Sequence, residues 1–81
     1  MLEADGILTE LRAIYARRGV DIDPRPEMAL ADLGFRSLDF SELALRLEER
    51  LGRELNFGGG ELRRLVTVGD VVDLLLTSAA R

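Results

Sequence analysis

Apolar residues near the start of the chain recur at the spacing of one buried helix face. They are Ile7, Leu8, Leu11, Ile14 and Tyr15. Two arginines and Gly19 follow this stripe. Both features are typical of a helix end, because cations complement the helix dipole and glycine readily adopts a left-handed cap. The pattern therefore predicts a first helix over residues 2–18.

A long loop is predicted after this helix, because Pro24 and Pro26 cannot lie within a helix and bias the residues before them to extended geometry. Residues 27–33 have the pattern of a short helical turn inside the loop. Apolar side chains that we expect to pin the loop onto a helix bundle recur along it: Val20, Ile22, Met28, Leu30, Leu33 and Phe35.

A second helix is predicted over residues 38–51, where apolar residues again mark one buried face. These residues are Phe40, Leu43, Ala44, Leu47 and Leu51. Gly52 is expected to end the helix. The acidic residues of this segment fall largely outside the apolar stripe, so we expect an acidic outer surface that Arg46 and Arg50 interrupt.

The last third of the chain predicts one short helix and one long helix. Phe57 is a large apolar anchor before three glycines, and residues 61–65 favour a short helical turn. Thr67 and Asp70 have the spacing of a capping box, with Asp in place of the usual Glu. The buried stripe of the helix that follows comprises Val68, Val71, Val72, Leu75 and Leu76.

These elements predict an all-α fold, a small four-helix bundle of three main helices and one short helix, with a long loop between the first and second helices. With 81 residues, the chain is expected to form a single domain over residues 1–81. It contains neither cysteine nor histidine. Thiolate chemistry, disulfides and the commonest general base and metal ligand are therefore missing, which disfavours a self-sufficient enzyme.

The net charge of −4 disfavours nucleic acid as a partner, because phosphates are bound chiefly by an excess of basic side chains. No apolar run approaches the length of a membrane span. The acidic start of the chain also differs from the basic start of a signal peptide. We therefore expect a cytoplasmic protein that binds neither nucleic acid nor a membrane.

Ser37 precedes the predicted second helix and has two interpretations. Serine is among the best helix N-caps, and Asp39 just inside the helix suits the dipole, so spacing alone predicts that Ser37 is the N-cap. A serine hydrolase is disfavoured, because the glycine of a nucleophile elbow and a histidine base are both missing. The second interpretation is a point of covalent attachment.

The segment "LGFRSLD" at residues 33–39 resembles the attachment motif of the acyl carrier protein family, which includes peptidyl and aryl carrier domains. The family motif reads roughly Leu-Gly-x-Asp-Ser-Leu-Asp and follows a long loop at the start of the second helix. Residues 42–57 resemble that helix and the apolar turn behind it, and "TVGDVVDLL" at residues 67–75 resembles the opening of the last helix. The resemblance covers essentially the whole chain in register.

This resemblance implies a carrier protein rather than an enzyme. In the family, a phosphopantetheinyl transferase moves 4′-phosphopantetheine from coenzyme A onto the motif serine, which corresponds to Ser37. The thiol of the arm then holds an acyl, aminoacyl or polyketide group as a thioester. The resemblance implies a monomer that shuttles such groups between loading, synthase or transferase enzymes; a peptidyl or aryl carrier is the alternative within the family.

In the family, partners recognise the second helix through acidic side chains and a few apolar contacts. The positions of this chain that match the recognition face are Leu38, Asp39, Glu42, Leu45, Glu48 and Glu49. For the carboxylates, the alternative is an ordinary solvated helix face. For Leu45, the alternative is a residue at the rim of the core.

Arg36 departs from the family pattern, in which Asp usually precedes the serine. A cation in the first turn opposes the helix dipole at a cost of up to about 1 kcal/mol. Arg36 is expected either to contact the phosphate of the arm or to select an unusual transferase or partner. If neither holds, the chain is an unmodified interaction module.

The modest acidity and the arginines at positions 63 and 64 also differ from familiar fatty-acid carriers. Both features favour a dedicated carrier of a specialised pathway, such as polyketide, hybrid or peptide assembly. Because the chain opens with Met1 and carries no linker flanks, we expect a freestanding carrier, with an excised module as the alternative.

Overall fold

The computed structural model of the protein describes residues 2–81. Its elements in chain order are α1 (Ala4–Arg17), the 3₁₀ turn η1 (Leu30–Leu33), α2 (Ser37–Leu51), α3 (Gly59–Arg63) and α4 (Val68–Ala80). Apart from an isolated bridge between Ala29 and Thr67, residues 2–81 contain no β structure. The predicted all-α fold, with three main helices, one short helix and a long first loop, is confirmed.

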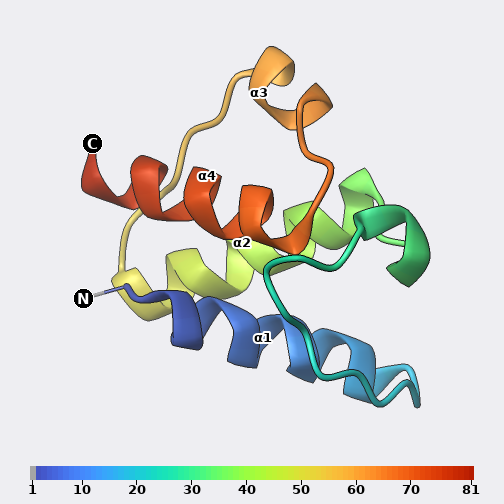
Figure 1. Cartoon of the computed structure of the whole chain (residues 1–81). Helices are drawn as coiled ribbons and strands as arrows, with labels where there is room; N and C mark the ends of the chain where they lie inside the picture. The colour runs from blue at the N-terminus through green and yellow to red at the C-terminus, as the bar shows by residue number, and fades with distance from the viewer. Residues whose placement is uncertain (1) are drawn as a thin grey trace.

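The helices α1, α2 and α4 form the body of the bundle, and α3 stands to one side in the connection between α2 and α4 (Figure 1). α1 packs against both α2 and α4. The end of α1, η1 and the beginnings of α2 and α4 lie at the same end of the bundle (Figure 1). Within residues 2–81, each helix is too short or too polar to cross a membrane.

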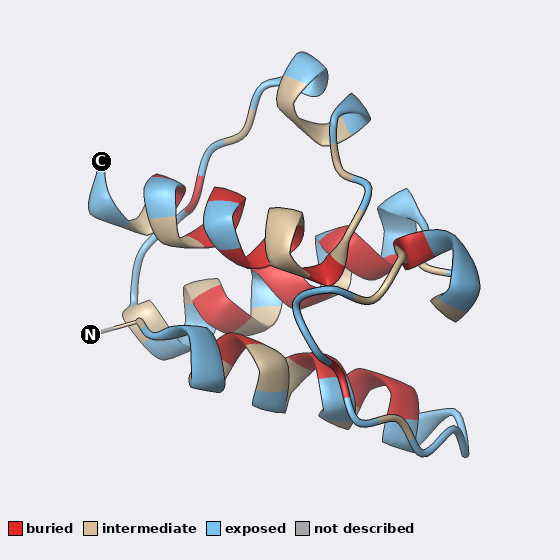
Figure 2. Cartoon of the chain, viewed as in Figure 1, coloured by how far each residue is buried: buried red, intermediate tan, exposed pale blue. Residues whose placement is uncertain are grey.

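The core lies where the inner faces of the three long helices meet (Figure 2). Its largest fully buried side chains are Ile7, Leu11, Ile14, Leu43, Leu47, Val68, Val71 and Leu75. All of them belong to the stripes predicted from the sequence, and their removal from water is the main driving force for folding. Phe57 packs edge to face on Phe40 of α2, with ring centroids 5.0 Å apart, which confirms its role as an anchor.

One predicted loop anchor is wrong. Val20 is 45% exposed, because its backbone closes the end of α1: the Val20 N–H donates to the Tyr15 carbonyl, and the side chain points to solvent. The remaining apolar residues of the loop are buried or partly buried against the core, as predicted.

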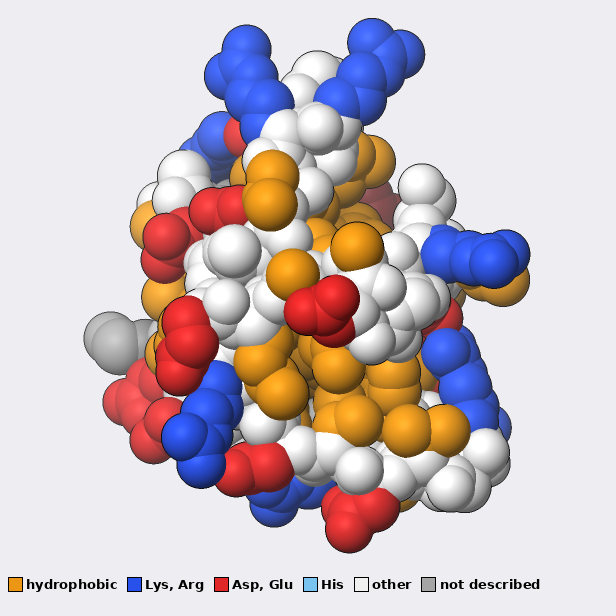
Figure 3. Space-filling view, turned by 45° about the vertical axis from the view of Figure 1, so that its right-hand side comes forward, with side chains coloured by type: hydrophobic (Ala, Val, Ile, Leu, Met, Phe, Trp, Pro, Cys, Tyr) orange, Lys and Arg blue, Asp and Glu red, His pale blue; other side chains and the backbone are white. Residues whose placement is uncertain are grey.

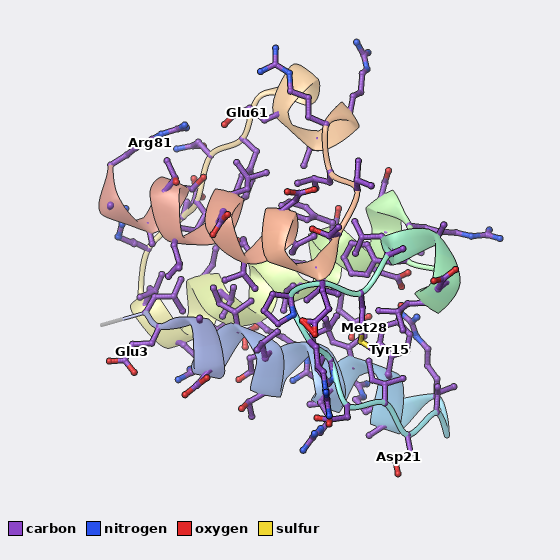
Figure 4. The ribbon with its side chains drawn as sticks, in the orientation of Figure 1. Glu3, Tyr15, Asp21, Met28, Glu61 and Arg81 are labelled. Carbon is purple, nitrogen blue, oxygen red and sulfur yellow. The ribbon has the colours of Figure 1, made fainter. Side chains whose placement is uncertain are left out.

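α3 begins two residues before the predicted turn, at Gly59 rather than at Glu61. The Glu61 carboxylate accepts a hydrogen bond from the Gly58 N–H at 3.0 Å, which satisfies a backbone donor at the start of the helix. This hydrogen bond is the main reason that the pKa of Glu61 is lowered. Glu61 also pairs with Arg81 at the end of α4, at 3.2 Å (Figure 4).

The long loop is held against the start of α4 by backbone hydrogen bonds. The Leu30 N–H donates to the Val66 carbonyl, and the Val68 and Gly69 N–H groups donate to Met28 and Pro26. A Cβ atom at position 69 would lie 3.1 Å from the Pro26 carbonyl oxygen, so glycine permits this close approach. The contacts fix the position of η1, which leads directly into the candidate site.

α4 begins with the capping box predicted from the sequence. The Thr67 hydroxyl accepts from the Asp70 N–H at 3.2 Å, and the Asp70 carboxylate accepts from the Thr67 and Val66 N–H groups at 3.0 and 2.9 Å. The two backbone hydrogen bonds lower the pKa of Asp70 below its ordinary value of 3.8, and the bond from the Thr67 N–H has the larger effect.

The stability contributed by Asp70 is therefore expected to depend on pH. A carboxyl group whose pKa falls on folding stabilises the protein above its unfolded pKa, and this stabilisation is lost as the pH falls through the folded pKa. The wild type should unfold at higher urea than Asp70→Asn at about pH 7, and the difference should shrink by about pH 2. Asp73→Asn is the control, because Asp73 is exposed on the same helix; an unchanged difference across this range would contradict the prediction.

Candidate functional site

Ser37 is the first residue of α2 and its side chain is exposed. The N-cap is Arg36, whose backbone is extended with φ −127° and ψ 172°. The prediction that Ser37 caps the helix is therefore wrong. The hydroxyl of Ser37 is not needed to begin the helix, and it is accessible from solvent.

Asp39 performs the capping role that spacing assigned to Ser37. Its Oδ2 atom accepts from the Arg36 N–H at 2.8 Å, and its Oδ1 atom accepts from Nη2 of Arg18 at 2.5 Å. The ion pair with Asp39 raises the pKa of Arg18, chiefly through this side-chain hydrogen bond. Asp39 is only 5% exposed. The prediction that Asp39 faces partners is therefore not supported, because its carboxylate binds α1 and the start of α2.

Replacing Asp39 by Ala is expected to destabilise the bundle. The change removes a cap at the start of α2 and leaves Arg18 without its closest carboxylate. We expect the free energy of unfolding to fall by about 1–3 kcal/mol, measured by urea denaturation. Glu49→Ala is the matched control, because Glu49 is exposed on the same helix and makes no ion pair within residues 2–81. Equal losses in the two variants would contradict this role for Asp39.

The other predicted carboxylates of α2 are also largely engaged within the chain. Glu42 lies within 4 Å of three guanidinium groups, at 3.8 Å from Arg17, 3.5 Å from Arg18 and 3.8 Å from Arg46. Glu48 accepts a hydrogen bond from the Leu55 N–H at 2.7 Å. Of the four, only Glu49 is exposed. Asp39 and Glu42 are thus paired with arginines, while Glu48 and Glu49 keep their charges.

The two predicted apolar contacts of α2 point outward. Leu38, next to Ser37, is 79% exposed, and Leu45, two turns further along, is 60% exposed. Single exposed apolar side chains are normal on protein surfaces, and these two lie on the helix that begins with Ser37. Leu45 is thus not a rim residue of the core, and both side chains are available to a partner.

A cavity of about 510 Å³ opens beside Ser37. It is bordered by residues of η1, the start of α2, and α3 with the segment that follows it, namely Leu30, Ala31, Phe35, Arg36, Ser37, Phe40, Leu62, Leu65 and Val66. Its walls are mainly apolar, with the Ser37 and Arg36 side chains at the polar side. Figure 3, in which this side of the molecule is turned toward the viewer, shows hydrophobic side chains gathered on the surface.

The turn that presents Ser37 is held from two sides. Gly34 adopts φ +64°, a left-handed conformation that favours glycine and lets the chain turn from η1 into α2. The Tyr15 hydroxyl donates to the Leu33 carbonyl at 2.9 Å, so α1 fixes the same turn (Figure 4). The serine therefore lies on a rigid base at one edge of the cavity.

The electrostatics at Ser37 favour a phosphate ester. The first backbone N–H groups of an α-helix have no acceptor within the helix, and the positive end of the dipole lies at the same place. Arg36 adds an exposed guanidinium beside the serine. An anion attached to the Ser37 hydroxyl would thus meet backbone donors and a cation, and a flexible group beyond it would meet the apolar cavity.

Some residues of the site were not predicted from the sequence. Arg18 was read only as a helix-end cation, and its contact with Asp39 depends on how α1 packs against α2. Leu62, Leu65 and Val66 line the cavity, although they lie 25 or more positions after Ser37. Their apolar spacing in a short helix was the signal available, and it does not tell which neighbour they face.

Comparison with known proteins agrees with this geometry. Residues 7–75 match the family described as "Phosphopantetheine attachment site". The fold is similar to the crystal structure of an acyl carrier protein from Thermotoga maritima, with a TM-score of 0.72 and 21% sequence identity, over 98% of this chain and 93% of that chain. Carrier proteins of this kind are not enzymes, and their prosthetic group is 4′-phosphopantetheine. With its helical bundle and the family match through most of its length, the chain belongs to the acyl carrier protein family.

Proposed function

We propose that Ser37 is the attachment point of 4′-phosphopantetheine and that the chain carries acyl or polyketide-type groups as thioesters on this arm. The observation that carries the proposal is the position of the Ser37 hydroxyl: exposed, at the start of α2, and beside an apolar cavity. Ser41 and Ser78 are the other serines. Ser78 is buried, and Ser41 does not line the cavity.

Attachment is a phosphoryl transfer in which the chain provides the nucleophile. The Ser37 Oγ atom attacks the phosphorus atom of coenzyme A that bears the pantetheine group. A phosphodiester bond to Oγ forms, the bond to the other phosphate breaks, and adenosine 3′,5′-bisphosphate leaves. The hydroxyl proton passes to the transferase, because this chain contains no histidine and Asp39 is occupied by Arg18 and Arg36.

The arm, when attached, supplies the thiol that this cysteine-free chain lacks. The first turn of α2 and Arg36 would hold the phosphodiester, through backbone N–H groups and a guanidinium. The walls formed by Phe35, Phe40 and Leu62 would shield an apolar portion of the cargo from water.

A single loading experiment tests the proposal. The wild type is incubated with a broad-specificity phosphopantetheinyl transferase and butyryl coenzyme A, and its intact mass is measured before and after treatment with neutral hydroxylamine. One butyryl-phosphopantetheine group should be added per chain, and hydroxylamine should remove only the butyryl group, because thioesters react with it and phosphodiesters do not. No added mass with this transferase or with those of the encoding organism would refute the proposal.

The cargo is proposed to come from a specialised pathway, on the basis of the surface charge. The acidic residues of α2 are largely engaged in internal ion pairs and hydrogen bonds, so this surface differs from the acidic one expected for a general fatty-acid carrier. Comparing loading by a malonyl transferase with loading by an amino-acid or aryl-acid adenylating enzyme separates a polyketide-type carrier from a peptidyl or aryl carrier.

A second candidate function is an interaction module that is never modified. Arg36 favours it, since a cation stands directly before Ser37 where the family pattern has an acidic residue. If wild type gains no mass but Arg36→Asp does, the transferase tested is excluded by Arg36. If neither protein gains mass with any transferase, the chain acts through its surface alone.

A further inference from the structure

Three arginines, one lining the cavity and two next to residues that line it, make no ion pair and donate no side-chain hydrogen bond within residues 2–81. Eight of the eleven basic residues make an ion pair or donate a side-chain hydrogen bond within residues 2–81. The three that make neither are Arg36, Arg63 and Arg64. Free guanidinium groups that share one region can form an electrostatic surface that a partner recognises.

The three arginines lie on the same end of the molecule. Arg36 borders the cavity directly, and Arg63 and Arg64 stand between Leu62 and Leu65, which also border it. All three are exposed. Figure 3 shows basic side chains projecting over α3, above the hydrophobic side chains of this face. We refer to Arg36, Arg63 and Arg64 as the arginine rim.

Nearby carboxylates do not fully offset the positive charge of the arginine rim. Glu61 of α3 is bound to the Gly58 N–H and to Arg81, and Asp70 is bound to the Val66 and Thr67 N–H groups. Asp32 of η1 is exposed beside the cavity-lining Ala31. Asp32 and Asp70 each keep one negative charge, because the partners of Asp70 are neutral backbone groups, and Glu61 also lies in the field of Arg64. Since Glu61 is paired with Arg81, the three guanidinium groups exceed the two unpaired carboxylates, although the whole chain carries a net charge of −4.

Apolar side chains lie within the same face. Leu38 is 79% exposed and Val66 is 63% exposed, and Val66 also lines the cavity. Apolar contacts surrounded by charged groups are typical of protein docking surfaces, where the apolar part gives affinity and the charges give specificity and speed. The overall acidity of the chain and the presence of Leu38 beside Ser37 favour a protein over a nucleic acid.

We propose that the phosphopantetheinyl transferase of the organism that encodes this chain docks on the Ser37 face through carboxylates that pair with the arginine rim. This inference rests on the proposed attachment at Ser37. We identify the transferase as the partner by charge complementarity. A protein that brings coenzyme A to the Ser37 hydroxyl must cover Arg36 and approach Arg63 and Arg64, so carboxylates on its surface would pair with these arginines. Arg36, Arg63 and Arg64 are then the residues that determine which transferase modifies the chain.

The test measures kcat/KM for attachment by that transferase with charge-reversed carriers. The test variant is Arg36→Glu, Arg63→Glu and Arg64→Glu together. The control is Arg12→Glu, Arg25→Glu and Arg53→Glu together, which changes the net charge equally but lies away from the cavity. Thermal unfolding of each variant confirms that it is folded.

Reversal of the rim should lower kcat/KM about tenfold or more, mainly through KM, and the control should not. The difference should shrink between about 0.05 M and about 0.5 M NaCl, because salt screens the ion pairs. An unchanged or raised kcat/KM in the test variant, or an equal fall in the control, would overturn the inference. A third result would also overturn it: an unchanged kcat/KM in the test variant, together with binding of the wild type but not the test variant to phosphatidylglycerol vesicles. That result would assign the arginine rim to a lipid surface.

The endpoint of the same reaction separates this inference from the function on which it rests. After exhaustive incubation, intact mass shows whether the wild type carries one phosphopantetheine. If the wild type is modified but reversal of the arginine rim leaves kcat/KM unchanged, only the docking surface is refuted. A wild type that stays unmodified with every transferase of the organism refutes the attachment itself.

Discussion

The Ser37→Ala variant is expected to accept no phosphopantetheine and to remain folded. Loss of the only proposed nucleophile removes attachment completely. Stability should change by less than about 0.5 kcal/mol, because Ser37 is an exposed first-turn residue and the N-cap is Arg36. Intact mass after incubation with coenzyme A and a transferase measures the first effect, and urea denaturation measures the second.

Ser41→Ala provides the matched control for this variant. Ser41 is exposed on α2, one turn after Ser37, so the same chemical change is made on the same helix. It should be modified to the same extent as the wild type. Modification of Ser37→Ala, or loss of modification in Ser41→Ala alone, would place the attachment point elsewhere. A loss of stability near 1 kcal/mol in Ser37→Ala would restore Ser37 as a capping residue.

The Leu47→Ala variant should show the largest loss of stability among those considered. Leu47 has no exposed surface and packs in the core between the three long helices. Removing a buried leucine side chain loses apolar burial and leaves a cavity, at a cost of about 2–5 kcal/mol in the free energy of unfolding. Such a loss is a large share of the total stability of a small domain, so the urea midpoint should fall sharply.

Leu45→Ala tests whether this effect comes from burial. Leu45 lies on the same helix two positions earlier and is 60% exposed. Its replacement should change the free energy of unfolding by less than about 0.5 kcal/mol. Similar losses in the two variants would mean that helix propensity, rather than the packing of Leu47, determines the effect.

The long helices could be predicted because their buried faces follow one period over several turns. Ile7, Leu11 and Ile14 in α1 and Phe40, Leu43 and Leu47 in α2 are all buried where the spacing places them. The prediction that Val20 anchors the loop was wrong, because apolar character alone does not decide burial in a loop. Its backbone closes α1, and that role turns the side chain to solvent.

The start of α2 was misassigned although a signal was present. Counting three residues from Ser37 gives Phe40, which cannot accept a hydrogen bond, whereas counting three from Arg36 gives Asp39, which can. The acidic residue of a capping box therefore indicates the helix start more reliably here than the hydroxyl of Ser37. The Asp39 hydrogen bond to the Arg36 N–H is the contact that decides it.

The partner surface could not be predicted, because its charges depend on contacts between distant segments. Asp39 and Glu42 meet Arg18 only when α1 packs against α2, 21 and 24 positions away in the sequence. The cavity likewise forms only where η1, α2 and the α3 segment meet. A motif therefore locates Ser37, but the tertiary structure determines which of the surrounding charges remain free.

The central claim, that the chain is a carrier with its arm on Ser37, is tested most directly by locating the arm. Wild type that has reacted with coenzyme A and a transferase is digested, and the fragments are sequenced by tandem mass spectrometry. We predict one phosphopantetheine per chain, on Ser37 and on no other residue. An unmodified chain, or an arm on Ser41 or Ser78, would contradict it.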